Sequence, residues 1–247
     1  MPDRCFCECV RDGVVRQPAN TWSNLAFVLV GILVVVKARR DLRRDWLAHD
    51  ANPMRTEPIY PTVYATATIL VGVGSFFYHL SLAFVGQVID VISMYLVTAF
   101  ILLYNLARLT PMDDNTFSGA YILVNLLLGY LSVRWPVLRR YIFVALLLGT
   151  LLSEVVLRRK LKRRLNATYL VVALVCLFAA LACWILDITG VVCAPESAFQ
   201  GHALWHVLMA GVIWLIYLYY RSEIVGVPTR APSGAFRASA QYGQRSV

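Results

Sequence analysis

Apolar residues occur along this chain in long runs, separated by short charged or Pro- and Gly-containing segments. A membrane-spanning helix needs about 20 mainly apolar residues, with a range of about 17 to 25. Seven runs approach or meet that length, and they predict helices near residues 21–37, 60–82, 86–107, 117–133, 138–157, 167–187 and 199–220. The pattern therefore predicts an all-α, polytopic membrane protein built as a bundle of seven transmembrane helices.

The composition agrees with a membrane protein. Of the 247 residues, 59% are hydrophobic and only 15% are charged, and the mean hydropathy is +0.64; an ordinary soluble domain is excluded. The first run lacks a preceding basic segment and a small-residue cleavage site, so we expect a retained span. We expect an outer segment at 1–19, a membrane domain at 20–222 and a disordered tail at 223–247, which is rich in Pro, Gly, Ser and Ala.

The net charge of +9 raises the question of a nucleic-acid partner. The basic residues, however, lie beside the apolar runs, as in 37–46 and 158–164. Placing the 37–59 loop in the cytoplasm puts 17 of the 23 Lys and Arg residues on that side, which is the positive-inside distribution of membrane proteins. The charge therefore predicts an outer N-terminus, a cytoplasmic C-terminus and the lipid bilayer as the partner, with no nucleic acid.

The chain has only four histidines, and three of them fall in predicted spans. His49 lies in the charged 37–59 loop and is expected to be a solvated surface residue. His202 and His206 are four residues apart, so their imidazoles share one helix face and are spaced to chelate one divalent metal. The pair alone fits equally well with two core histidines that hydrogen-bond to neighbouring helices.

The predicted topology brings further polar groups to the level of this pair. His79 follows Ser75 by four residues and lies near the outer end of the second helix, while Asp90 begins the third helix after a tight outer turn. All three histidines therefore fall in the same leaflet as Asp90. Three histidines with one open position form the ligand set of catalytic zinc. The sequence predicts a zinc site on His79, His202 and His206.

No glutamate lies between His202 and His206, so a general base must come from another helix. Asp90 is the leading candidate, and its alternative role is to cap the turn or to orient a ligating histidine. Asp187 and Glu154 are the alternatives to Asp90. Asp187 is expected to be a solvated helix end, and Glu154 is expected to pair with basic residues at the inner end of its helix.

Taken together, these residues resemble a known signature. Residues 74–90 match the pattern GSxxxHxxLxFxGQxxD, residues 202–208 match HxxWHxL, and "NTWSN" lies at 20–24. The combination resembles the alkaline ceramidase family, which belongs to a superfamily of seven-helix membrane hydrolases that also contains the adiponectin-type receptors. The resemblance spans nearly the whole seven-helix domain.

The resemblance implies a hydrolase of ceramide-like membrane lipids that releases a fatty acid and an amine. Zinc would polarise the amide carbonyl and lower the pKa of its bound water toward about 7. Asp90 would transfer protons, and Ser75 would donate a hydrogen bond to the developing oxyanion. Two rivals remain open: a lipid-binding, receptor-like member of the superfamily with little turnover, and a lipid ester hydrolase.

The N-terminal segment departs from the family pattern, which uses acidic residues there to bind calcium. Glu8 is kept, but Cys5, Val10 and Gln17 stand where the family has Asp, Asn and Glu, so calcium loses oxygen ligands. The candidate calcium or second-shell residues are Glu8, Gln17, Asn20 and Asn24. Asn20, Ser23 and Asn24 share a helical face that either braces the site or caps the first helix. We expect Asn20 to cap the helix and Asn24 to bond across helices.

The cysteines fit this topology. Cys193 lies in an outer loop, and an oxidising outer compartment would allow it a disulfide with an N-terminal cysteine. The resemblance favours Cys7, and Cys9 remains an alternative. Cys176 and Cys183 are expected to be small core residues of the sixth span.

Overall fold

The computed structural model describes residues 6–44, 52–161 and 164–224. The elements are α1 (Pro18–Ser23), α2 (Leu25–Leu42), α3 (Pro53–Thr56), α4 (Ile59–Ser81), α5 (Phe84–Leu109), α6 (Asp114–Arg134), the short 3-10 helix η2 (Pro136–Leu138), α7 (Arg139–Leu161), α8 (Ala167–Ile188) and α9 (Gly201–Arg221). No β-strand occurs in these ranges, apart from an isolated bridge between Arg164 and Ile224. His49, Cys5 and the tail beyond residue 224 lie outside the described residues.

Seven helical spans within the described residues are long and apolar enough to cross a membrane. The first span, Pro18–Leu42, consists of α1 followed by α2, and the fifth, Pro136–Leu161, consists of η2 and α7. The prediction of an all-α, seven-helix, multi-pass membrane protein is therefore confirmed.

Several helices extend further than their apolar runs. The fourth span begins at Asp114, because the Asp113 side chain accepts hydrogen bonds from the backbone N–H groups of Asn115 and Thr116 and so caps α6. The side chain of Asn166 caps α8 in the same way. α7 continues through Arg158 and Arg159, whose cationic side chains suit a helix C-terminus. A hydrophobic run therefore predicts the apolar part of a membrane-spanning helix and misses the polar residues at its ends.

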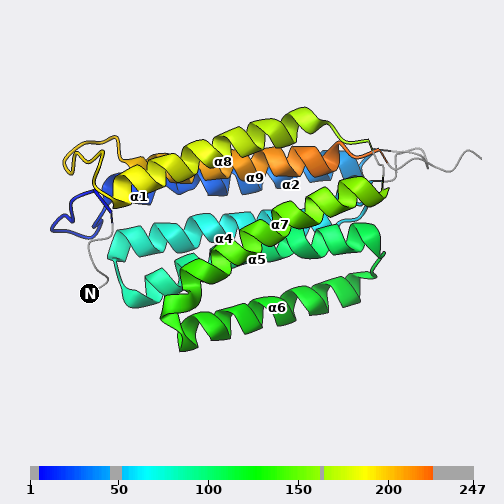
Figure 1. Ribbon diagram of the computed structural model, residues 1–247, viewed down its shortest axis with the longest axis horizontal. Coiled ribbons are helices and arrows are strands. Elements are labelled where there is room, and N and C mark those ends of the chain that lie inside the picture. Colours follow the sequence, from blue (N-terminus) through cyan, green and yellow to red (C-terminus); the bar gives the residue numbers. More distant parts are fainter. Residues whose placement is uncertain (1–5, 45–51, 162–163, 225–247) are drawn as a thin grey trace, which may run out of the picture.

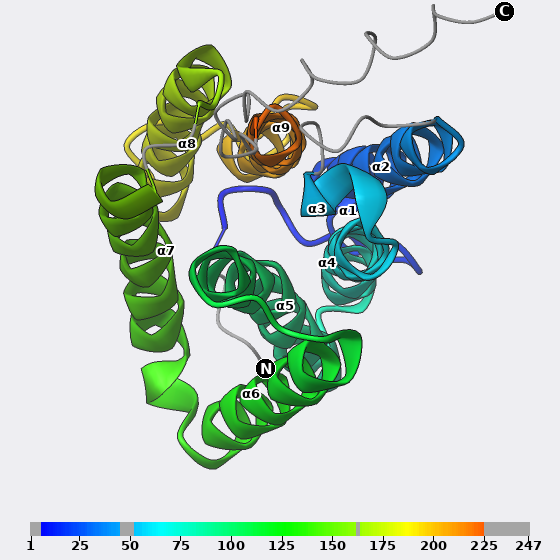
Figure 2. The same ribbon diagram turned by 90° about the vertical axis from the view of Figure 1, so that its right-hand side faces the viewer.

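The helices run along the long axis of the molecule (Figure 1). α4 packs against α2 and α5, and α9 packs against α2 and α8. α6 and α7 pack on α5, while α7 and α8 barely touch although they follow one another in the chain. The end view shows α7 and α8 along one side of the bundle (Figure 2). Because α7 and α8 do not pack closely, side chains of α5, α7, α8 and α9 line the interior between these helices.

Both polar and apolar side chains lie inside this bundle, whereas large apolar side chains cover much of its outer surface. Leu123, Leu126 and Phe178 are exposed, as expected for residues that face lipid, whereas Thr68 and Asn105 are buried. An aromatic cluster fills the centre of the core and comprises Tyr60, Tyr64, Phe100, Tyr104, Phe117 and Tyr217. An apolar outer surface with polar groups buried inside is what a bilayer requires, because those polar groups must find partners within the protein.

A buried ionic network closes the end of the bundle where α5, α7 and α9 finish. The Arg108 guanidinium bonds Glu154 at 2.8 Å and both carboxylate oxygens of Glu223 at 3.1 Å. Glu154 also lies 3.5 Å from Arg158 and accepts a short hydrogen bond from Tyr219. The prediction that Glu154 pairs with basic residues is confirmed. Glu223, the first residue of the predicted tail, is buried, so the folded domain reaches at least residue 224.

Candidate metal centre

Three histidines meet at the end of the bundle that also holds the N-terminal segment and the α8–α9 loop (Figure 1). His79 lies in the last turn of α4, and His202 and His206 lie in the first turns of α9. All three are buried, and one nitrogen of each lies within 4.8 Å of the others. The closest pair is Nε2 of His79 and Nε2 of His202, 3.2 Å apart. Residues separated by more than 120 positions in the sequence are therefore close enough to bind one ion.

Hydrogen bonds at Nδ1 of His79 and of His206 define which nitrogen of these two imidazoles is free. The Gln17 amide donates from Nε2 to the carbonyl oxygen of Glu8 at 3.2 Å, so its Oε1 accepts from Nδ1 of His79 at 2.8 Å. The Ser23 hydroxyl donates to the carbonyl oxygen of Asn20 at 3.0 Å, so it accepts from Nδ1 of His206 at 2.8 Å. Nε2 of both histidines then carries the lone pair, as metal-ligating imidazoles require.

This arrangement fits a metal ion. Nε2 of His79 and Nε2 of His206 are both acceptors, and His202 brings a third ring nitrogen to the same point. Nδ1 of His202 has no hydrogen-bond partner among the described residues. A buried site that gathers several nitrogen lone pairs is stabilised by a cation, and imidazole suits the divalent transition metals.

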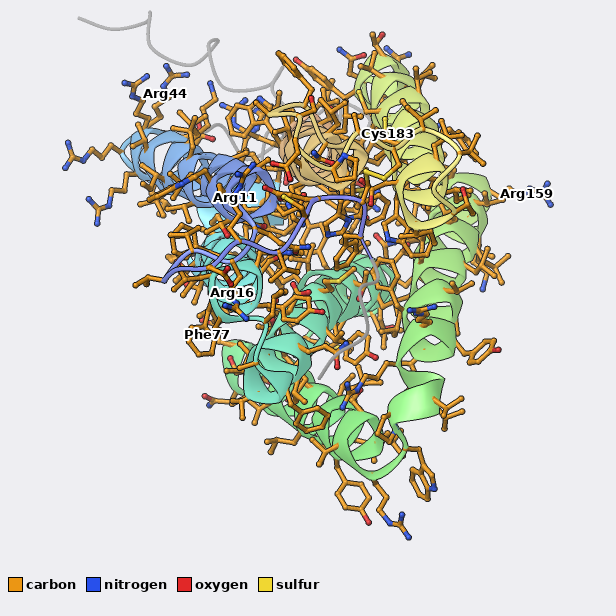
Figure 3. The ribbon with its side chains drawn as sticks, turned by 90° about the vertical axis from the view of Figure 1, so that its left-hand side faces the viewer. Arg11, Arg16, Arg44, Phe77, Arg159 and Cys183 are labelled. Carbon is orange, nitrogen blue, oxygen red and sulfur yellow. A yellow bond between two sulfur atoms is a disulfide. The ribbon has the colours of Figure 1, made fainter. Side chains whose placement is uncertain are left out.

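The N-terminal segment forms a cover over the histidines, and the Phe6 ring stacks on His202 with 3.8 Å between ring centroids. A disulfide joins Cys7 to Cys193, the pairing that the resemblance implies, with 5.4 Å between their Cα atoms. Cys9, Cys176 and Cys183 are free. Figure 3 looks onto this end and shows the segment that carries Arg11 and Arg16 crossing it.

Asp187 is not the solvated helix end that the sequence suggested. It is buried, and its two carboxylate oxygens accept the backbone N–H groups of Cys7 and His202, each at 3.0 Å. The carboxylate thus ties the N-terminal segment to the first turn of α9, where anions are favoured by the helix dipole. The prediction failed because the partners lie 180 and 15 residues away in the sequence.

The candidate calcium residues surround α1. Both Glu8 oxygens accept backbone N–H groups, from Ala19 at 2.7 Å and from Asn20 at 2.9 Å. Burial raises the pKa of Glu8 above its ordinary value, although these two bonds favour the charged form. Glu8, and not Asn20, therefore caps the first helix, which begins at Pro18. The Asn24 amide donates to the Asn20 carbonyl oxygen at 2.7 Å and not across helices as expected. Within the described residues, Glu8 therefore stabilises the start of α1, and Gln17 bonds His79.

A cavity of about 310 Å³ extends from the histidines into the bundle. Ser75, Asp90, His202 and His206 line it at the histidine end, together with Phe6. Apolar side chains such as Met94, Leu147 and Leu174 line its length, and Glu154 lies at the far end. Asp90 and His206 thus border one space with an apolar extension, which suits a lipid chain.

Ser75 links the two chemical groups of this space. Its hydroxyl lies 3.5 Å from Nε2 of His206 and interacts with the Asp90 carboxyl group. The structure therefore brings all five candidates for metal binding and catalysis together. Phe6 was missed by sequence reasoning, because an aromatic residue in a short polar segment carries no signal of its target.

A family model for ceramidases matches residues 6–229 of the chain. The match includes all seven spans, the histidine cluster, and the N-terminal residues that bond it. No curated protein matches the sequence. Because the match covers nearly the whole chain and coincides with a buried three-histidine group, this protein belongs to the ceramidase family.

Proposed function

We propose that the protein is an intramembrane, zinc-dependent amide hydrolase that cleaves ceramide or a related N-acyl lipid into a fatty acid and an amine. The observation that carries the proposal is the shared cavity: His202, His206, Ser75 and Asp90 border one space with an apolar extension, and His79 completes the buried three-histidine group beside it. Membership of the ceramidase family supports a ceramide-type hydrolase.

His79, His202 and His206 are the proposed zinc ligands. Three histidines leave one coordination position open, which is typical of catalytic zinc. A bound zinc ion supplies Lewis acidity, which polarises a carbonyl group and lowers the pKa of water. The hydrogen bonds that Gln17 accepts from Nδ1 of His79 and Ser23 accepts from Nδ1 of His206 keep both ligand nitrogens deprotonated and fix the planes of the rings.

Asp90 and Ser75 are the proposed proton-transfer and oxyanion residues. The Asp90 carboxylate accepts a proton from the attacking water and returns it to the amine nitrogen as the C–N bond breaks. The Ser75 hydroxyl donates a hydrogen bond to the carbonyl oxygen as negative charge develops on it. Water adds across the amide bond, so the products are a carboxylic acid and an amine.

The cover of the site has a role in this chemistry. Phe6 packs on His202 and lines the cavity, and the disulfide anchors its neighbour Cys7. Excluding bulk water strengthens each electrostatic interaction inside the site. The apolar wall of the cavity holds the acyl chain, so the scissile amide is presented at the histidine end.

The test is a joint measurement of metal content and fatty-acid release. Wild type, His206→Ala and His49→Ala are purified in detergent, and each is assayed on a panel of ceramides and one ester analogue of matched chains. His206→Ala should lose both zinc and turnover. His49→Ala, which removes the histidine of the predicted cytoplasmic loop, should keep both.

The outcomes separate the parts of the proposal. Stoichiometric zinc without turnover of any lipid refutes the enzyme but leaves the metal site, as a receptor-like protein would show. Absence of zinc from the wild type refutes both. If the ester is turned over faster than the amide, the bond that the enzyme cleaves is an ester and not an amide.

A further inference from the structure

Arg139 is a buried cation at the histidine end of the cavity. It is the first residue of α7 and is only 7% exposed. Its Nε donates to the carbonyl oxygen of Ser132 at 3.0 Å, and its Nη1 donates to Oε1 of Gln87 at 3.2 Å. The Tyr95 hydroxyl bonds the backbone oxygen of Arg139 at 2.8 Å, and the guanidinium lies 5.4 Å from the centre of the Phe84 ring. These contacts hold the side chain in one position.

None of these partners is an anion. Within the described residues, no carboxylate forms an ion pair with Arg139, and its Nη2 has no hydrogen-bond partner. Arg108, which is the other buried arginine of the described residues, has two carboxylate partners in Glu154 and Glu223. A guanidinium cannot release its charge at physiological pH. A buried charge without a counter-ion is unfavourable, so a buried cation in this state at the end of a span is a functional candidate.

The position of Arg139 relates it to the chemistry. Arg139 and Arg140 line the same cavity as Asp90 and His206. Gln87, which holds Nη1 of Arg139, lies three residues before Asp90 on α5, so both point from one face of that helix. The apolar extension of the cavity runs the other way, toward Glu154. With the acyl chain in that extension and the amide at the histidines, the amine-bearing part of a lipid lies beside Arg139.

We propose that the preferred substrate is an N-acyl lipid that carries an oxyanion, such as a phosphate, sulfonate or carboxylate, on its amine-bearing part, and that Arg139 binds this group. The planar fork of a guanidinium matches such oxyanions with two parallel hydrogen bonds. The unpartnered Nη2 supplies one donor, and the substrate supplies the missing counter-ion. This inference rests on the proposed amide hydrolase and names its substrate class.

The test uses N-acyl lipids with the same acyl chain and base and with a hydroxyl, phosphate, sulfonate or carboxylate head group. For each lipid, kcat/KM is measured with wild type, Arg139→Gln, Arg139→Lys and Arg134→Gln. Arg134 is an exposed arginine in the last turn of α6 that does not line the cavity, so its variant makes the same charge change away from the site. Wild type should have a higher kcat/KM for at least one oxyanion lipid than for the hydroxyl lipid. The lipid with the highest kcat/KM identifies the preferred oxyanion.

In Arg139→Gln that preference should fall by about tenfold or more, the factor that corresponds to 1.4 kcal/mol, and in Arg134→Gln it should stay unchanged. Arg139→Lys keeps the positive charge but lacks the planar guanidinium, so it should lose part of the preference. If Arg139→Gln does not fold, Arg139→Lys serves as the test instead. An unchanged preference in the Arg139 variants overturns the inference, as does a wild type that favours the hydroxyl lipid. If an Arg139 variant keeps the wild-type head-group preference and only shows weaker inhibition by free fatty acid, the inference is also overturned. Arg139 would then bind the carboxylate of the fatty-acid product.

If no lipid is cleaved, the proposed function fails and binding decides the inference separately. Thermal stabilisation of wild type by an oxyanion lipid, beyond that by the hydroxyl lipid and lost in Arg139→Gln, supports it. Equal stabilisation by both lipids overturns it.

Discussion

Replacing Gln17 by leucine removes the hydrogen-bond acceptor of His79 and keeps a buried side chain of similar size. Oε1 of Gln17 accepts from Nδ1 of His79 at 2.8 Å. In the metal-bound state Nε2 of His79 is a ligand, so its Nδ1 must carry the proton and needs an acceptor. In the metal-free state the proton can move to Nε2, which lies 3.2 Å from Nε2 of His202. The penalty of the substitution therefore falls mainly on the metal-bound state.

The size of the effect follows from the cost of an unsatisfied buried donor. That cost is about 1 to 3 kcal/mol, and each 1.4 kcal/mol changes an equilibrium constant tenfold. The dissociation constant of the metal should therefore rise by roughly 5- to 150-fold, in line with the 10- to 100-fold typical of partners of metal-ligating histidines. The Gln17 amide also bonds Glu8, so a modest loss of thermal stability should accompany the change.

The assay is competition between the purified protein and a chromogenic zinc chelator, at fixed pH. Gln17→Glu serves as the conservative variant, because a carboxylate still accepts from Nδ1 of His79. Asn125→Leu serves as the matched control, because it removes an amide in α6 whose hydrogen-bond partner among the described residues is the Tyr121 carbonyl oxygen. A wild-type zinc affinity in Gln17→Leu, or an equal loss in Asn125→Leu, would show that the acceptor of His79 does not support metal binding.

Four further predictions test the remaining parts of the site. Asp90→Asn should keep its zinc but lose about 10²- to 10⁴-fold in kcat, the range for a general acid–base residue; an intact rate refutes proton transfer by Asp90. Ser75→Ala should lower kcat by up to about 10²- to 10³-fold at unchanged zinc content, and a change confined to KM would contradict the oxyanion role. Cys193→Ser opens the disulfide to Cys7 and should lower the free energy of unfolding by about 2 to 5 kcal/mol; the control is the free Cys176, and an equal shift of the unfolding temperature in Cys176→Ser would count against the disulfide. Because both Glu8 oxygens accept backbone N–H groups, millimolar calcium should not change activity in zinc-buffered solution, and a calcium-dependent rise that Glu8→Gln abolishes would establish a calcium site.

Local physics explains which features were predictable. The seven spans follow from the length and composition of the apolar runs, since a helix in a bilayer is specified by its own residues. The shared level of His79, His202 and Asp90 follows from counting spans, because alternate helix ends lie on the same side. The ends of α6 and α7 were underestimated, because Asp113 and Arg158 support helix termini while breaking the apolar pattern.

The sequence alone determined the fold class, the ionisable residues within the spans and the fact that His79, His202, His206 and Asp90 meet at one end of the bundle. Only the tertiary structure decided which groups touch: Gln17 on His79, Ser23 on His206, Phe6 on His202, and Asp187 between the N-terminal segment and α9. It also decided that Arg108 has carboxylate partners and that Arg139 has none among the described residues. The physical reason is that span formation depends on neighbours in the chain, whereas these contacts join segments up to 196 residues apart, and their geometry is set by how the helices pack.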